Sequence, residues 1–289
     1  EFETLENVWN SIVAKIFRLS LINRTYTFCS IERCVELKVI YDNTAQRLKP
    51  IPRTEEIPQL VELSIDKTCN LYCASCRSKV CVESGAKRER IEAVKNKIIQ
   101  SGWLEKAGHL LLGGQGEVFF SPTYKSILFD TTSKREFVHV RTNGTLMTAE
   151  NLQRMVDLYK KICISVSIDA VTKETYNRLR RNDNIHTWEN LCNNMEVLAE
   201  FKKEKKIESF TMSMCVQMDN YLEMPAFIQW GERLGADSIN LAPIRNWGTY
   251  TNEEFCDVSI MCENKILKPE VSELLLNSVF NKDIVHLLF

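Results

Sequence analysis

From about residue 60 onward, short segments rich in apolar and β-branched residues alternate with segments of helical periodicity. We expect strands at 61–66, 109–114, 137–143, 162–169, 209–217 and 238–243, and helices at 87–102, 123–134, 148–161, 187–204 and 224–235. Strands that alternate with helices at this spacing predict βαβ units and a parallel sheet. Six units in roughly 185 residues are too few for the closed eight-stranded barrel. The predicted fold class is therefore α/β, an open, partial (β/α)6 TIM-like barrel.

The two ends of the chain do not share this alternation. Residues 3–23 predict one amphipathic helix, and residues 48–58 contain three prolines, which favours a linker. A further helix is expected at 268–280. We predict three parts: a small cysteine-containing N-terminal extension with its linker at 1–55, a barrel core at 56–250, and a small cysteine-containing C-terminal extension at 251–289.

Composition excludes several classes of function. The formal net charge is −1 and there is no basic stripe, so no nucleic-acid partner is expected. No apolar stretch approaches the roughly 20 residues that cross a bilayer, and the first residues lack a signal-peptide pattern. The sequence has eleven cysteines, an odd number with uneven spacing. Without a secretory signal, this usage favours a reducing, cytoplasmic compartment and metal or catalytic roles over disulfides.

Residues 69–76 read CNLYCASC and place three thiols, Cys69, Cys73 and Cys76, directly after the first expected strand. A structural zinc site usually takes four protein ligands. Thiolates are soft ligands that select zinc, copper(I) or iron–sulfur clusters. A cubane cluster normally has four thiolate ligands, so three would leave one iron open to a substrate group. The alternatives are a zinc knuckle that borrows a distant ligand and buried free cysteines.

Polar or glycine-containing segments follow the other expected strands. In parallel α/β architectures, chemistry collects at the carboxyl ends of the strands. These segments are GGQGE at 113–117, TNG at 142–144, SID at 167–169, VQ at 216–217 and PIRN at 243–246. Their shared position is the strongest structural argument that the sequence offers for a site.

The CxxxCxxC spacing after a first strand, followed by a glycine-rich second strand end, resembles the motif of the radical S-adenosylmethionine (radical SAM) enzymes. The resemblance covers residues 60–250 and implies a partial (β/α)6 barrel. It further implies that the three cysteines hold a 4Fe-4S cluster whose unique iron chelates S-adenosylmethionine. The implied products are methionine and a 5'-deoxyadenosyl radical that abstracts hydrogen from a substrate. An electron donor such as flavodoxin or ferredoxin is implied as a partner. One departure is Ser75, where many members carry an aromatic residue.

The same resemblance suggests further contacts to S-adenosylmethionine. Glycines at a strand end allow close backbone approach, and Glu117 adds an acceptor for an ammonium group. Ser167 and Asp169 alternate with apolar residues and share one face of their strand. The residues implied in cofactor binding are Gly113, Gly114, Glu117, Asn143, Ser167, Asp169, Gln217 and Arg245. Arg178, Arg180 or Arg181 would supply a cation for the methionine carboxylate, and the sequence does not decide which.

Residues 5–34 resemble the closing portion of a SPASM or twitch extension, which binds an auxiliary iron–sulfur cluster. In most relatives that portion follows the barrel, whereas here it precedes it. Its candidate ligands are Cys29, Cys34, Cys256 and Cys262, with ordinary cysteines or a small zinc site as the alternatives. Cys81, Cys163, Cys192 and Cys215 are interpreted as structural.

The resemblance leaves the substrate open. SPASM-like extensions favour modification of a peptide or protein, and close relatives also act on sugars or aminoglycosides. A non-catalytic iron–sulfur or zinc-binding interaction protein is the alternative from another class. A methyltransferase is less favoured, because the sequence indicates no additional cofactor-binding domain.

Overall fold

The computed structural model describes residues 4–29, 58–130, 135–182, 184–262 and 266–289. By internal contacts the chain divides into two units. Unit 1 contains residues 1–58 and 96–107, and unit 2 contains residues 59–95 and 108–289. Residues 48–57 of the predicted linker and Cys34 lie outside the described residues. The predicted three-part division remains a prediction.

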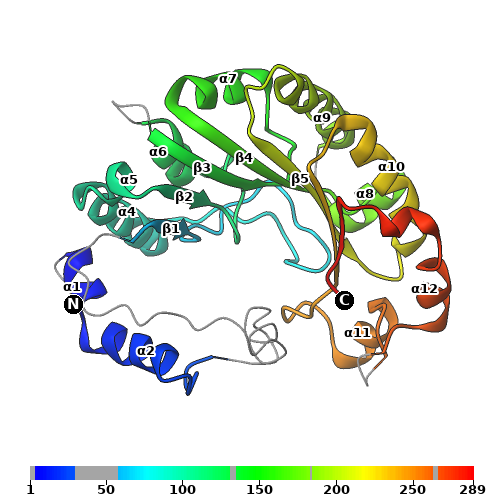
Figure 1. The fold of residues 1–289 in the computed structure, drawn as a ribbon, viewed down its shortest axis with the longest axis horizontal. Coiled ribbons are helices and arrows are strands. Elements are labelled where there is room, and N and C mark those ends of the chain that lie inside the picture. The colour runs from blue at the N-terminus through cyan, green and yellow to red at the C-terminus, as the bar shows by residue number, and fades with distance from the viewer. Residues whose placement is uncertain (1–3, 30–57, 131–134, 183, 263–265) are drawn as a thin grey trace. The chain divides into compact units, whose positions relative to one another are not determined.

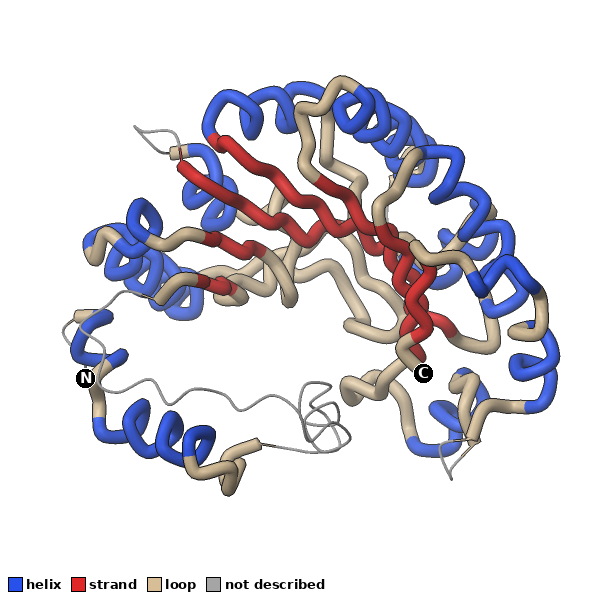
Figure 2. Tube along the Cα trace, viewed as in Figure 1, coloured by secondary structure: helices blue, strands red, loops and turns tan. Residues whose placement is uncertain are grey.

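Unit 2 is built on one sheet of seven parallel strands in sequential order, β1-β2-β3-β4-β5-β6-β7 (Figures 1 and 2). The strands are β1 (Leu60–Leu63), β2 (His109–Leu112), β3 (Arg135–Thr142), β4 (Tyr159–Ser167), β5 (Ser209–Val216), β6 (Ser238–Pro243) and β7 (Val285–Leu287). The sheet is curved but not closed, since β1 and β7 are its two edges. This arrangement confirms the predicted parallel α/β fold with a partial barrel.

Helices connect successive strands, and α6, α7, α9 and α10 follow the convex side of the sheet (Figure 1). The helices within the described residues are α1 (Leu5–Trp9), α2 (Ile12–Ile22), α4 (Gly85–Gln100), α5 (Trp103–Lys106), α6 (Pro122–Phe129), α7 (Ala149–Leu158), α8 (Lys173–Arg180), α9 (Thr187–Lys203), α10 (Met224–Leu234), α11 (Asn252–Val258) and α12 (Pro269–Leu274). Two 3-10 turns are η1 (Tyr221–Glu223) and η2 (Ser278–Asn281). Thr148 caps α7, as predicted, by accepting a hydrogen bond from Asn151 N at 3.3 Å.

The core of unit 2 lies between the sheet and α6, α7, α9 and α10. Strand β5 shows why, because its side chains alternate between fully buried and half-buried positions. Phe210, Met212 and Met214 are almost completely buried. Burying each such side chain contributes roughly 1.5–3 kcal/mol. The residues between them, Ser209, Thr211, Ser213 and Cys215, are small and either polar or polarisable. They face the concave side of the sheet, where the strand ends form a site.

The structure differs from the sequence-based expectation at several boundaries. The expected helix at 148–161 ends at Leu158, because Tyr159 already pairs with Arg135 as the first residue of β4. The expected helix at 268–280 is α12 followed by the short η2. The seventh strand, β7, was not predicted. It adds Val285–Leu287 to the sheet through pairing with β6.

Unit 1 contains α1, α2, the end of α4 and α5. The single helix expected at 3–23 is interrupted at Ser11, whose extended backbone and side chain form the N-cap of α2. The rings of Trp9 and Trp103 pack edge to face with centroids 6.0 Å apart. None of the described helices is both long and apolar enough to cross a lipid bilayer.

Candidate functional site

The three-cysteine loop follows β1 and is held in place by the end of α8. Tyr72 N donates to Arg181 O at 3.0 Å, and Ala74 N donates to Leu179 O at 2.9 Å. These two backbone hydrogen bonds lie on either side of Cys73 in the sequence. The loop that carries the thiols is therefore positioned by a helix that comes about 100 residues later in the chain.

A cavity of about 420 Å³ opens at the carboxyl ends of the strands, beside this loop. Cys69, Cys73 and Cys76 all line it. Five of the predicted cofactor-binding residues line it as well: Gly114, Glu117, Asn143, Ser167 and Asp169. Strands β5 and β6 contribute Ser213, Cys215 and Asn240 to the wall. The structure thus brings most of the predicted site residues of unit 2 to one cavity.

Each of the three thiols has a nitrogen donor nearby. Arg180 Nη1 lies 3.5 Å from Cys73 Sγ, and Arg77 Nε and Nη2 both lie 3.4 Å from Cys76 Sγ. Asn143 Nδ2 lies 4.0 Å from Cys69 Sγ.

Burial disfavours the charged form of two of these thiols. It raises the pKa of Cys69 to about 11. Burial also raises the pKa of Cys73, and the charge of Arg180 opposes that shift. These two thiols are consequently poor anions unless a metal centre withdraws their protons.

The glycine loop after β2 packs closely on the cysteine loop. Glu117 N donates to Thr68 O at 2.9 Å. A Cβ atom at Gly116 would lie 2.7 Å from Thr68 O and closer still to the carbonyl of Asp66. Gly114 has a φ of 136°, which L-residues rarely adopt, so it allows the loop to turn into the cavity.

We expect Gly116→Ala to destabilise unit 2 by about 1–3 kcal/mol, because both obstructing atoms are backbone and cannot rotate away. The midpoint of urea unfolding measures this effect. A matched control is Gly108→Ala in the same unit, where the Cβ would meet only ordinary contacts with Gln59, at 3.4 and 3.6 Å. Equal midpoints for Gly116→Ala and the wild type would contradict the prediction.

Glu117 lines the cavity but already accepts three hydrogen bonds. Its Oε1 accepts from Thr142 Oγ1 at 2.6 Å and from Phe119 N at 3.1 Å, and its Oε2 accepts from Asn143 N at 2.7 Å. Burial raises the pKa of Glu117, and these hydrogen bonds oppose the shift. The carboxylate fixes the end of β3 to the glycine loop, and Oε2 keeps a lone pair for one more donor.

Asp169 follows β4 and forms a buried ion pair with Arg180. The Nε of Arg180 lies 3.0 Å from Asp169 Oδ2, and Asp169 Oδ1 accepts from Cys215 N at 2.7 Å. Asp169 has a left-handed φ of 68°, which turns the chain out of β4 toward α8. Burial raises the pKa of Asp169, and Arg180 opposes the shift. Of the three candidate arginines, Arg180 is the one that lines the cavity.

Three predicted cofactor-binding residues do not line this cavity: Gly113, Gln217 and Arg245. Gly113 lies against the backbone of β3, where a Cβ would be 2.5 Å from Arg141 O. Gln217 is buried, and its Oε1 has no hydrogen-bond partner within the described part of the chain. Arg245 is exposed in the segment after β6.

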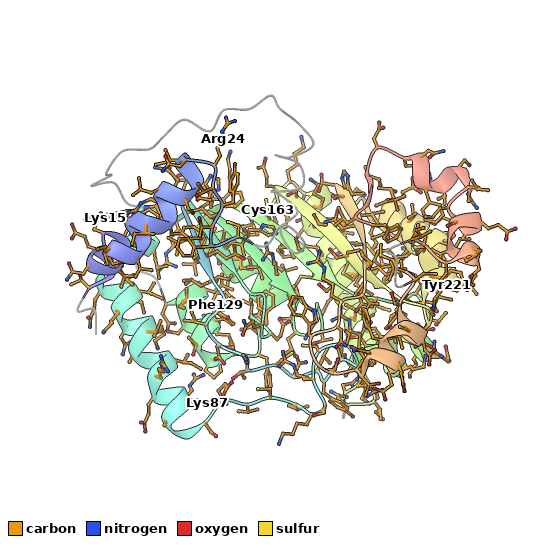
Figure 3. The ribbon with its side chains drawn as sticks, turned by 90° about the horizontal axis from the view of Figure 1, so that it is seen from below. Lys15, Arg24, Lys87, Phe129, Cys163 and Tyr221 are labelled. Atoms are coloured by element: carbon orange, nitrogen blue, oxygen red, sulfur yellow. The ribbon has the colours of Figure 1, made fainter. Side chains whose placement is uncertain are left out.

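The remaining cysteines are spread over the chain. Cys256 and Cys262 are exposed in unit 2, and Cys29 is half-buried in unit 1. Cys34 lies outside the described residues. Cys163 lies within β4, in the middle of the sheet (Figure 3). Cys81 and Cys192 are half-buried, and the structural role predicted for them remains a prediction. Cys215, for which a structural role was also predicted, lines the cavity.

Sequence reasoning missed two groups at the site. Arg77 directly follows Cys76, and besides its sulfur contacts it donates to Lys67 O at 2.7 Å and Gln115 O at 2.5 Å. Asp66 is fully buried under the loop, where it accepts from Ser121 Oγ at 2.6 Å. The sequence does show that Arg77 adjoins the cysteine motif and that Asp66 stands near the end of a strand. Neither position indicates which residue the side chain contacts.

The donor set fits an iron–sulfur cluster. Among the described residues, no three His, Cys, Asp or Glu side chains converge closely enough to hold a single metal ion. A cubane cluster needs no such convergence, because each thiolate binds a different iron atom. Three thiols from one loop, two arginine contacts to sulfur and an adjoining cavity with polar walls match the requirements of such a cluster and one bound organic ligand.

Comparison with known proteins gives three findings. The sequence model of the Radical SAM superfamily matches residues 63–230. The antilisterial bacteriocin subtilosin biosynthesis protein AlbA of Bacillus subtilis (strain 168) is 29% identical over 133 residues, which cover 44% of this chain and 28% of AlbA. Among solved structures, anSMEcpe with bound AdoMet has a TM-score of 0.50 at 17% identity, covering 77% of this chain and 58% of that one.

A further solved structure is Streptococcus suis SuiB bound to the precursor peptide SuiA, with a TM-score of 0.50 at 11% identity. The match covers 99% of this chain and 64% of SuiB. The chain therefore spans less than two thirds of the length of each of these three proteins. At these identities, the likeness to the solved structures supports the fold.

Proposed function

Because the matched residues 63–230 make up more than half of this chain, the chain belongs to the radical SAM superfamily, and we propose that it cleaves S-adenosylmethionine reductively to act on a peptide. The superfamily uses a 4Fe-4S cluster and S-adenosylmethionine. One observation carries the proposal for this chain. Cys69, Cys73 and Cys76 line the same cavity as the polar ends of β3 and β4.

In the proposed arrangement, Cys69, Cys73 and Cys76 hold the cluster. When bound, the cluster and S-adenosylmethionine supply one-electron reduction of a sulfonium and a 5'-deoxyadenosyl radical that abstracts hydrogen. The protein's residues position the cofactor and limit access of water. We assign the cavity-lining Gly114 to the methionine end, where its backbone is accessible without a side chain. Ser167, at the end of β4, is assigned to ribose hydroxyls.

The experiment is anaerobic reconstitution with iron and sulfide, followed by dithionite and S-adenosylmethionine. We expect absorbance near 400 nm, roughly where thiolate-ligated clusters absorb, and formation of 5'-deoxyadenosine and methionine in equal amounts. Both products are measured by liquid chromatography and mass spectrometry. A protein with a full cluster that forms neither product would favour the non-catalytic, metal-binding alternative. In the cell we propose a reducing cytoplasm, with flavodoxin or ferredoxin as the electron donor.

A peptide is the substrate class that we favour. The support is the name of AlbA, a bacteriocin biosynthesis protein, and the precursor peptide bound to SuiB. Short peptides encoded beside the gene are the probes, and a mass loss of about 2 Da per modification would mark hydrogen removal. The second candidate is a sugar or aminoglycoside, tested in parallel with neamine. Turnover of neamine with no change in any peptide would overturn the peptide assignment.

We also propose an auxiliary iron–sulfur cluster bound by Cys29, Cys34, Cys256 and Cys262. The support is their place in the sequence, two in each predicted extension, and the exposure of Cys256 and Cys262, which leaves both thiols accessible to a ligand. We expect about eight irons per chain after reconstitution, two cubanes of four. The double variant Cys256→Ala, Cys262→Ala should retain about four. Four irons in the wild type would contradict the auxiliary cluster and leave the first one intact.

A further inference from the structure

The nitrogen donors around the three thiols differ in charge. Cys73 and Cys76 each contact a guanidinium, whereas Cys69 contacts neutral donors, the backbone N–H of Leu71 and the amide of Asn143 at 4.0 Å. Arg77 approaches Cys76 with two nitrogens at once. Two of the three thiolates that the proposed function assigns to the cluster thus have a fixed positive charge beside them.

We propose that Arg77 and Arg180 are positioning residues that stabilise the reduced form of the cluster by donating N–H groups to the sulfurs of Cys76 and Cys73. This inference rests on the proposed function, because it assumes a cluster on these cysteines. It assigns to both arginines a role separate from binding S-adenosylmethionine, which can be measured without that ligand.

The physical basis is the charge change on reduction. Adding an electron increases the negative charge on the sulfurs, and hydrogen bonds to sulfur together with nearby positive charge favour that state. Both contacts are built into the fold. Arg77 is held by the carbonyls of Lys67 and Gln115, which leaves its Nε directed at Cys76. Arg180 is nine-tenths buried, where the effective dielectric constant is low.

The two arginines should differ in strength. Arg180 is paired with Asp169 at 3.0 Å, so the carboxylate cancels part of its field at the sulfur. The described ion pairs include no carboxylate for Arg77, whose charge acts on Cys76 without such compensation. Solvent screens Arg77 in part, because its side chain is not fully buried. We expect Arg77 to have the larger effect on the reduction equilibrium.

The test is an anaerobic redox titration of the reconstituted full chain with dithionite, followed by electron paramagnetic resonance, without S-adenosylmethionine. The variants are Arg77→Gln and the double variant Arg180→Gln, Asp169→Asn, which removes both charges of the buried pair together. The control is Arg178→Gln, on the same helix as Arg180. Its side chain pairs with Asp219 at 3.5 Å and does not line the cavity. Iron and sulfide contents are matched before titration.

For Arg77→Gln, we expect the equilibrium constant for uptake of the electron to fall about tenfold. That corresponds to a midpoint potential about 59 mV more negative for one electron. The double variant should shift in the same direction by less, and Arg178→Gln should titrate with the wild type. An unchanged potential in Arg77→Gln with wild-type iron content overturns the inference, even where the double variant fails to fold. A wild-type protein that forms no reducible cluster overturns the proposed function itself.

Discussion

Cys73→Ala is expected to abolish formation of 5'-deoxyadenosine and to prevent binding of a complete cluster. Cys73 is the middle thiol of the loop, and the backbone hydrogen bonds of Tyr72 and Ala74 fix its position. Alanine keeps these backbone contacts but removes the ligand. Loss of an outer-sphere partner typically costs 10–100-fold in metal affinity or activity, so we expect loss of a ligand to exceed about 100-fold. Iron analysis and product chromatography measure the two effects.

Cys81→Ala is the matched control for this variant. Cys81 lies beside the loop, and its carbonyl accepts from Cys69 N at 2.8 Å, a contact that alanine retains. Its sulfur does not line the cavity. We expect wild-type iron content and cleavage. Full activity in Cys73→Ala would contradict the assignment of the cluster to this loop, and equal losses in both variants would point to folding of the loop instead.

Arg180→Met is expected to destabilise the protein by about 3–5 kcal/mol, because it leaves a buried carboxylate without its partner. The side chains of Arg180 and Asp169 are only 10% and 11% exposed, and their atoms are 3.0 Å apart. Methionine fills a similar volume without charge. The midpoint of urea unfolding of the metal-free protein measures the loss, which separates it from any effect of the cluster.

Arg178→Met is the control on the same helix. Its ion pair with Asp219 is long, at 3.5 Å, and both side chains are about half exposed. Exposed pairs of this kind contribute about 0–1 kcal/mol. Similar unfolding midpoints for the two variants would contradict the importance of the buried pair.

The loss in Arg180→Met should shrink as the pH falls. Burial already raises the pKa of Asp169, and the variant removes the charge that opposes this shift. An acid whose pKa is higher in the folded state binds more protons there than in the unfolded chain. Lowering the pH from the raised folded pKa toward the ordinary value near 3.8 therefore favours the folded variant relative to neutral pH. Unfolding midpoints measured from neutral to mildly acid pH test this sign.

Local pattern predicted six of the strands and the loop of three cysteines, because alternation and spacing are properties of nearby residues. It did not predict β7, which has only three residues, Val285–Leu287, and depends on pairing with β6. It also missed α8, whose eight residues include only two large apolar side chains, Tyr176 and Leu179. The contact of Arg180 with Cys73 depends on α8, so no local signal could indicate which of the three arginines reaches the site.

Because the cysteine loop depends on α8 for its position, the loop can be fixed only after α8 has been synthesised. Cys73 leaves the ribosome 107 residues before Arg180, and the backbone acceptors for its loop, Leu179 and Arg181, arrive with that arginine. At about 5–20 residues per second, the thiols exist for roughly 5–20 s before the helix that fixes them. During that interval the nascent chain has the three cysteines without the anchor for their geometry. Productive loading with iron and sulfide is therefore expected to follow translation of α8, when the loop is already shaped to receive it.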